Sequence, residues 1–343
     1  MARGIAATIA VIPMAGHCAM RQESESRVAK ANAAMIAEAA RLLRGGRLVA
    51  FPTETVYGLG ADATSNTAVA GIYAAKGRPS FNPLIAHVAS LEAARREGVF
   101  NAEATALARA FWPGPLTLVL PMAPGGSVCD LARAGLDTLA LRVPAHPVAL
   151  ALLRAVDRPV AAPSANRSGH VSPTEAAHVL ADLAGQVDLI RDAGPATVGV
   201  ESTIVAFLED GARVLRPGGV ATEDVFRVLG RPIPMAAPPS ADILAPGMLA
   251  SHYAPRAGVR LDAVALQPGE AALDFGGQLA NCGAAQTIDL SPAGDLVEAA
   301  ANLFGALRTL DASGAAAIAV APIPERGLGE AINDRLRRAA AAR

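Results

Sequence analysis

Two segments far apart in the chain carry the residue types best suited to binding a charged ligand. Lys76 and Arg78 place two cations immediately before Pro79, in a turn that the proline stiffens. Ser164 and Asn166 follow an apolar run, so a hydroxyl and an amide come at the end of an expected strand. Cations combined with small hydrogen-bonding groups at strand ends are what a polyphosphate ligand requires. The two segments therefore predict a site for an anionic ligand, and with it an enzyme.

Polar residues also stand at the ends of other expected strands. Thr55 follows an apolar run in a short loop, and Ser202 lies in a small-residue turn that leads into another strand. Arg142 belongs to a strand that reads as buried, where an arginine must be paired or must face a ligand carboxylate. Arg216 repeats the pattern of a cation at a strand end before a proline. Each signal is weak alone, and their repetition indicates a binding site.

Each of these residues also has a purely structural interpretation. Lys76 and Arg78 would suit a solvated helix end, because cations stabilise helix C-termini. The threonines of residues 51–60 would suit an ordinary capped turn. His87, which ends an apolar strand, is of a kind that is more often structural than catalytic. Phosphate-loop, dinucleotide-binding, zinc-protease and nucleophile-elbow motifs are all missing from the sequence.

Apolar runs and helical patterns alternate along the first two thirds of the chain, which predicts an α/β fold with a twisted open sheet flanked by helices. The order of the strands cannot be read from this pattern. We expect strands at residues 47–51, 84–88, 116–120, 138–143, 160–162 and 203–207. We expect helices at residues 27–44, 66–76, 102–111, 147–156 and 173–183.

A proline-rich stretch then separates a second, smaller unit from the first. Beyond it the pattern predicts strands at 271–275 and 315–321 and helices at 295–310 and 329–342. This unit is expected to be a Rossmann-like α/β domain of ordinary small size. The predicted organisation is an N-terminal extension (1–29), a catalytic domain (30–230), a linker (231–247) and a C-terminal domain (248–343).

The composition limits the classes of protein that fit. The 343-residue chain is 52% hydrophobic and 18% charged, with a formal net charge of −1. No global basic field is present to hold nucleic acid tightly, so any RNA contact would be local or transient. The widely spaced Cys18, Cys129 and Cys282 suggest neither a zinc ribbon nor a disulfide framework.

The first thirty residues loosely imitate a signal peptide, but Pro13 interrupts the apolar run and no clean cleavage site follows. No apolar stretch reaches membrane-spanning length without interruption. We therefore expect a cytoplasmic protein that does not associate with membranes.

Several ordered motifs resemble the YrdC-like family. These are FPTETVYGLG (51–60), KGRP (76–79), NPL (82–84), WPGPLT (112–117), PSAN (163–166) and GVESTI (199–204). The stretch from APGM (245–248) through HYAP (252–255), with the domain after it, is similar to the longer, two-domain threonylcarbamoyl-AMP synthases. The resemblance covers residue 30 to the end. It departs from the family at Ala250, where relatives often have a tyrosine that reaches the nucleotide.

The resemblance implies a nucleotidyltransferase that joins L-threonine, bicarbonate and ATP into threonylcarbamoyl-AMP and releases pyrophosphate. The product would pass to a transferase complex that modifies the adenosine beside the anticodon of certain tRNAs. The implied threonine-binding residues are Thr55, His87, Arg142 and Ser202. The implied ATP-binding residues are Arg78, Asn82, Thr138, Ala162, Ser164, Ser172 and Arg216. The implied catalytic signature is Lys76, Arg78, Ser164 and Asn166.

The residue chemistry agrees with this implication. Arg142 would balance the amino-acid carboxylate, while Lys76 and Arg78 would offset charge on the departing pyrophosphate. The carbamate of threonine is already an anion, so the step needs little base catalysis. No dedicated metal-ligand cluster is evident, so Mg²⁺ would be carried by the nucleotide.

Two other functions are compatible with the same motifs. One is an RNA-binding protein without synthase activity, which the near-neutral charge and the complete Lys76, Arg78, Ser164 and Asn166 set disfavour. The other is a carbamoyl-transfer module of hydrogenase maturation, which the missing zinc cysteine pairs and acylphosphatase-like region disfavour.

Overall fold

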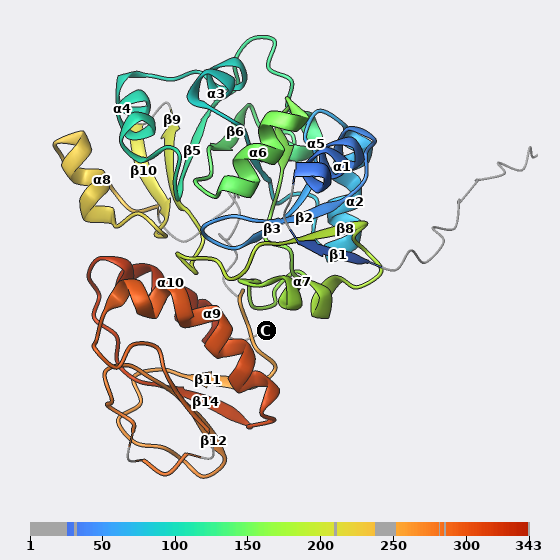
Figure 1. The fold of residues 1–343 in the computed structure, drawn as a ribbon. Coiled ribbons are helices and arrows are strands. Elements are labelled where there is room, and N and C mark those ends of the chain that lie inside the picture. Colours follow the sequence, from blue (N-terminus) through green and yellow to red (C-terminus); the bar gives the residue numbers. More distant parts are fainter. Residues whose placement is uncertain are drawn as a thin grey trace, which may run out of the picture.

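The computed structural model describes residues 26–30, 33–208, 211–236, 252–280, 282–284 and 286–341. Most of the expected extension 1–29, most of the expected linker 231–247, and Ala250 lie outside these ranges. The chain forms two α/β domains, a large one built on a ten-stranded sheet and a small one built on a four-stranded sheet (Figure 1). The predicted fold class is therefore confirmed.

The large sheet is mixed, with the strand order β1-β8-β2-β3-β7-β4-β6-β5-β9-β10. Its strands are β1 (Arg27–Lys30), β2 (Val49–Pro52), β3 (Tyr57–Asp62), β4 (Ile85–His87), β5 (Leu116–Pro121), β6 (Thr138–Arg142), β7 (Val160–Ala161), β8 (Leu189–Asp192), β9 (Thr203–Leu208) and β10 (Gly211–Arg216). Strands β2 and β4 to β7 are apolar over nearly their whole length, as expected for strands that are buried on both faces.

The helices of the large domain connect these strands and pack on the sheet (Figure 1). They are α1 (Ala33–Arg44), α2 (Asn66–Lys76), α3 (Leu91–Glu97), α4 (Ala102–Phe111), α5 (Asp130–Arg133), α6 (Pro147–Val156), α7 (Ala176–Leu183) and α8 (Thr222–Leu229). Polar side chains cap several of them, as expected from the sequence. Ser65, for example, accepts a hydrogen bond from the amide of Ala68 at the start of α2.

Two predicted segments are wrong in part, and the structure adds short elements that were not predicted, among them α3, α5, α8, β8 and β10. The single helix expected at 27–44 is wrong, because its first four residues form β1, which pairs in parallel with the exposed edge of β8. This strand also begins before the predicted domain boundary at residue 30. The loop expected at 51–60 contains most of β3. The two glycines of β3 are untypical of a strand, so the sequence pattern did not indicate one. A Cβ at Gly60 would lie 2.8 Å from the Phe51 ring, so only glycine leaves room for that ring.

The small domain has a parallel sheet in the order β11-β14-β12-β13. Its strands are β11 (Gly258–Arg260), β12 (Glu270–Asp274), β13 (Thr287–Asp289) and β14 (Ala317–Val320). Its two helices are α9 (Leu296–Ala312) and α10 (Leu328–Ala340), and both lie on the side that faces the large domain (Figure 1). The arrangement agrees with the predicted Rossmann-like domain.

The two domains share one hydrophobic core. Val56, Val171 and Val200 of the large domain are buried in the same cluster as the apolar side chains of the small one. At Gly199, with φ +76°, a Cβ would lie 2.3 Å from the carbonyl oxygen of Ala300. The backbones therefore meet directly, which fixes α9 against the loop that precedes β9.

Candidate active site

One pocket collects most of the polar residues that the sequence singled out. It lies where the turn after β2, the ends of β4, β6 and β7 and the start of β9 meet residues 252–253. Its lining residues are Thr53, Thr55, Val56, Gly58, Arg78, Ile85, His87, Arg142, Ala162, Pro163, Ser164, Glu201, Ser202, Arg216, His252 and Tyr253. All four implied threonine-binding residues are among them, as are four of the seven implied for ATP.

Strand register explains why these residues meet. Strands β4 and β6 are parallel, and His87 is directly opposite Arg142 where both strands end. Strand β7 runs antiparallel to β4, and the chain after it reaches Ser164, which bridges to Gly58 of β3. The carboxyl ends of parallel strands meet at one edge of a sheet, which is where α/β proteins bind ligands.

Lys76 joins the two segments that first suggested a site. It is the last residue of α2, where Gly77 ends the helix in the left-handed conformation at φ 59°. Its Nζ donates hydrogen bonds to the carbonyl oxygen of Ser164 at 2.6 Å and to the backbone and side-chain oxygens of Asn166. Only 3% of Lys76 is exposed, so the alternative of a solvated helix end is wrong.

Arg78 and Asn82 are buried with unused hydrogen-bonding capacity. Arg78 donates from Nη2 to the carbonyl oxygen of Pro83 at 3.3 Å, but its Nε has no partner among the described residues. Asn82 is fully buried, and neither atom of its amide has a partner in the described part of the chain. Buried polar atoms without partners are costly, so these three atoms are suited to contacts with a bound ligand.

The two cations of this corner lack carboxylate partners. In the part of the chain that the structure describes, neither Lys76 nor Arg78 forms an ion pair. Burial lowers the pKa of Arg78 to about 10, and burial together with the charge of Arg78 lowers the pKa of Lys76 well below its usual range. A bound polyanion would offset both effects and stabilise the charged forms.

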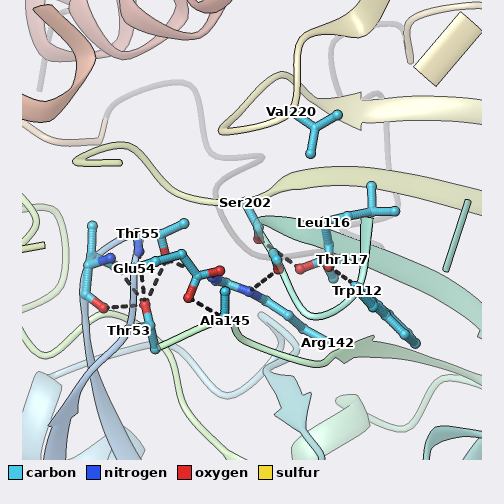
Figure 2. A network of polar contacts seen from close by, with 12 residues as sticks. Thr53, Glu54, Thr55, Trp112, Leu116, Thr117, Arg142, Ala145, Ser202 and Val220 are labelled. Atoms are coloured by element: carbon cyan, nitrogen blue, oxygen red, sulfur yellow. Dashed lines mark hydrogen bonds and ion pairs between the residues drawn. The ribbon is translucent and has the colours of Figure 1, made fainter. Parts of the chain in front are cut away.

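Arg142, in contrast, already has a carboxylate partner. Its Nη2 lies 2.6 Å from Oε1 of Glu54, and its Nη1 donates to Oγ1 of Thr55 at 2.9 Å (Figure 2). The amide of Ala145 donates to the other Glu54 oxygen at 3.0 Å. Burial is the largest single effect and raises the pKa of Glu54, but the Arg142 charge and the hydrogen bonds from Arg142 and Ala145 together outweigh it, so the pKa lies below its usual value. The pair is thus an ionised unit in the pocket wall.

Hydroxyl groups complete this wall. Thr53 fixes the turn, because its Oγ1 accepts hydrogen bonds from the amides of Thr55 and Val56. The Oγ of Ser202 lies 2.7 Å from the hydroxyl of Thr117 (Figure 2). The structural interpretation is therefore correct for Thr53, although both Thr53 and Thr55 line the pocket.

His87 and His252 are neutral components of the site. Burial, followed by the charge of Arg142, lowers the pKa of His87 to about 3. Burial lowers the pKa of His252 to about 3 as well, with Arg78, Lys76 and Arg216 acting in the same direction. Neither imidazole is poised to exchange protons near neutral pH, so the positive charge of the pocket comes from lysine and arginine.

Three implied ATP residues and two implied catalytic ones lie outside the lining. Thr138 begins β6 opposite Pro121, at the far end of the strand from Arg142. Ser172 donates its hydroxyl to Oε1 of Glu201 at 2.6 Å. The other three, Asn82, Lys76 and Asn166, are buried immediately behind the wall. The structure thus brings together the residues of both signature segments but leaves Thr138 apart.

The site residues predicted from the sequence did not include four residues that shape the pocket or its wall. They are Glu54, Glu201, Tyr253 and Arg335. Glu54 and Glu201 each sit beside an implied ligand residue, and a buried arginine predicts a nearby carboxylate. Arg335 is three residues after Ile332 and one before Leu336, on the apolar face of its helix. A charged arginine on the buried face of a helix was the sequence signal that could have identified Arg335.

No group of three or more potential metal ligands occurs within the described ranges. The carboxylate of Glu201, which lines the pocket, and that of Glu54 behind it are both paired with arginine. The described side chains therefore do not form a set suited to holding a metal ion by themselves. None of the helices that the structure describes combines the length and the apolar character needed to cross a membrane.

Known proteins match this chain over most of its length. A sequence model described as "Telomere recombination" matches residues 41–218, and one described as "Threonylcarbamoyl-AMP synthase, C-terminal domain" matches residues 220–341. The threonylcarbamoyl-AMP synthase of Pyrococcus abyssi is 44% identical over 89% of this chain and 94% of its own. The Bacillus subtilis synthase is 40% identical over 91% of this chain and 94% of its own.

Solved structures agree in both domains. The structure of P. abyssi Sua5 complexed with L-threonine covers 92% of this chain and 98% of its own, with a TM-score of 0.85 and 39% identity. A similarity of this extent includes the second sheet as well as the first, so it applies to the whole two-domain arrangement. On sequence and on structure, this chain belongs to the threonylcarbamoyl-AMP synthase family.

Proposed function

We propose that this protein makes threonylcarbamoyl-AMP from L-threonine, bicarbonate and ATP, with release of pyrophosphate. The observation that carries the proposal is the corner formed by Lys76, Arg78 and Asn82, whose charges and buried amide have no counterpart among the described residues. A triphosphate supplies what this corner lacks. A relative of this chain, P. abyssi Sua5, is known in complex with L-threonine, which supports the amino-acid substrate.

The proposed reaction needs two bond-forming steps. The amine of threonine combines with bicarbonate to give a carbamate and water. A carbamate oxygen then attacks the α-phosphorus of ATP, and the bond to the β-phosphate oxygen breaks to release pyrophosphate. Because the carbamate is already an anion, positioning and charge stabilisation suffice for the second step, and neutral histidines such as His87 are adequate.

We assign threonine to the wall that contains Thr55, His87, Arg142 and Ser202. We add Glu54 to this assignment, because its carboxylate is paired with Arg142. Arg142 would therefore bind the Glu54 carboxylate and the substrate carboxylate at the same time. The ammonium or carbamate end would then point toward Ser164.

ATP is assigned to Arg78, Asn82, Ala162, Ser164, Ser172 and Arg216, with Thr138 as the most distant candidate. Lys76 and Asn166 act together with Arg78 and Ser164, and the two cations offset the charge of the departing pyrophosphate. Mg²⁺ belongs to the proposal only as part of the MgATP substrate, since the described side chains provide no ligand set for it.

The wider setting is also proposed. The product would be handed to a transferase complex that modifies tRNA beside the anticodon, and any contact with RNA would be weak at a net charge of −1. The cytoplasm suits this reaction, and Cys129 and Cys282 are free thiols. We also propose the domain organisation predicted from the sequence, with a catalytic domain at 30–230, a linker at 231–247 and a C-terminal domain at 248–343.

The test is to incubate the purified protein with ATP, bicarbonate and one amino acid at a time, and to measure pyrophosphate. We expect release with L-threonine and little with valine, which lacks the hydroxyl. Release that is equal for all amino acids, or that persists without bicarbonate, would contradict the proposal. Salt-sensitive RNA binding without threonine-dependent release would favour the RNA-binding alternative.

A further inference from the structure

We propose that Arg335, on helix α10 of the small domain, is a positioning residue for the active site of the large domain. Its guanidinium holds Glu201 and Tyr253, two residues that line the pocket, although Arg335 itself does not line it. The inference rests on the proposed function for what the pocket does. It goes beyond that function by giving the small domain a defined part in catalysis.

The first contact fixes the start of β9. Arg335 donates from Nε to Oε2 of Glu201 at 2.8 Å and from Nη1 to the carbonyl oxygen of Pro217 at 2.9 Å. The other Glu201 oxygen accepts the hydroxyl of Ser172 at 2.6 Å. Ser202, which is proposed to bind the substrate threonine, follows Glu201 directly in the chain. Arg335 therefore positions Ser202 through the side chain of Glu201.

The second contact fixes the residues that lie over the pocket. The Arg335 guanidinium carbon lies 5.3 Å from the centre of the Tyr253 ring, in a cation–π contact. Phe304 of helix α9 stacks on the same ring, with 5.5 Å between the ring centres. Tyr253 also contacts the His252 ring, which lines the pocket beside it. The small domain therefore holds this part of the lining between two of its own side chains.

Burial makes the arrangement rigid. Arg335 is completely buried, and Asp334 accepts from its Nη1 at 2.7 Å. Arg216 at the end of β10 is a second cation that acts on Glu201, and the neutral imidazole of His252 also lies near this carboxylate. A buried carboxylate that loses its main counter-charge destabilises the fold, whereas a buried ion pair in which both charges are compensated is tolerated.

A second arginine of the small domain supports the same interpretation. Arg308 of α9 donates to the backbone carbonyl oxygens of Val171 and Ser172 and forms an ion pair with Asp182 at 2.8 Å. Helices α9 and α10 thus hold both ends of the Ser172–Glu201 hydrogen bond. The position of this bond depends on the docked small domain.

The experiment compares Arg335→Met with the double variant Glu201→Gln/Arg335→Met and with Arg335→Lys. We expect Arg335→Met to lower kcat by about a hundredfold, because small displacements in an active site have effects of this size. The loss should shrink as the pH falls, since protonation of Glu201 removes the unpaired charge. The double variant should recover at least tenfold of the loss and show no such pH dependence, and Arg335→Lys should recover part of it.

Arg337→Met is the matched control, because Arg337 lies two residues away on the same helix and pairs with Glu325 at the surface. Hydrogen exchange gives a readout that does not require activity. Arg335→Met should speed exchange in residues 203–207 and 252–258 but not in β4, and Arg337→Met should leave both unchanged.

Wild-type exchange and kcat in Arg335→Met would overturn the inference. A double variant as impaired as the single one, at every pH, would also overturn it, since it would show that only packing was lost. If wild-type protein releases no pyrophosphate with threonine, the proposed function fails, and the exchange data still decide the role of Arg335. Should Arg335→Met not fold, the double variant and Arg335→Lys decide the question.

Discussion

The ammonium group of Lys76 lies 2.6 Å from the carbonyl oxygen of Ser164, although 88 positions separate the two residues in sequence. The contact ties the end of α2 to the chain that follows β7. It thereby holds the hydroxyl of Ser164 and the guanidinium of Arg78 in the same corner of the pocket. Two segments that looked independent in the sequence are parts of one structure.

Replacing Arg78 with alanine should lower threonine-dependent pyrophosphate release by about a hundredfold or more, as expected when a preorganised electrostatic contact is lost. Arg78 lines the pocket and is 8% exposed. Arg95→Ala, at a surface arginine that contacts Thr105, is the control and should release pyrophosphate normally. Unchanged release by Arg78→Ala would contradict the assignment.

Replacing Arg142 with alanine should raise the KM for threonine more than the KM for ATP. The variant also leaves Glu54 buried without its partner, so the free energy of unfolding should fall by about 3–5 kcal/mol. Glu54→Gln/Arg142→Met should regain much of that stability without regaining threonine affinity. Denaturation and steady-state kinetics measure the two effects separately. Equal losses for both substrates would show that Arg142 is only structural.

A protein that ends at Gly230 should lose most of its activity, by about a hundredfold if the site is displaced slightly. The truncation removes His252 and Tyr253 from the pocket and exposes Val56, Val171 and Val200, which the small domain buries. Pyrophosphate release by the truncated protein measures the effect, with circular dichroism as the control for folding. Full activity would refute a role of the small domain in the site.

The two buried histidines should make the fold less stable in mild acid. His87 and His252 have a pKa of about 3 when folded and an ordinary value of 6.5, so the unfolded state binds more protons between these values. Stability is therefore complete above pH 6.5 and falls as the pH drops, by at most about 1.4 kcal/mol per pH unit for each histidine.

Urea denaturation between pH 5 and 7.5 measures this slope. The window keeps the carboxylates ionised, so the histidines dominate the change. His87→Asn should reduce the slope by less than half, because His146 and His178, whose pKa values burial also lowers, contribute in the same direction as His252. The exposed residue His170 serves as the control, because His170→Asn should leave the slope as it is. A slope that is the same in His87→Asn and in the wild type would show that His87 is not held neutral.

The regular elements were largely predictable because their patterns are local. The helices expected at 66–76, 102–111 and 147–156 have those bounds in the structure, since apolar spacing and capping residues agree there. The edge strand β1 was not predictable, because its pairing with β8 depends on a partner about 160 residues away. Strand β3 was hidden by glycines that make room for Phe51.

The site was predictable to the extent that its residues lie in recognisable motifs. Arg142 was expected to be paired or to face a ligand, and the structure shows the pair. Its partner Glu54 could not be chosen from the sequence, since only the strand register brings the two together. The role of Arg335 was even harder to predict, because its contact with Glu201 joins the two domains. No local sequence pattern shows how the two domains pack against each other.

The valines that the large domain contributes to the core of the small one should couple the unfolding of the two domains. Unfolding of the small domain would uncover Val56, Val171 and Val200 of the large domain. Calorimetry should therefore record a single transition, and heat inactivation should follow it closely. The time for which the enzyme stays active on heating is then set by this unfolding transition. A substitution that strengthens the packing between the two domains should raise the melting temperature and lengthen that time.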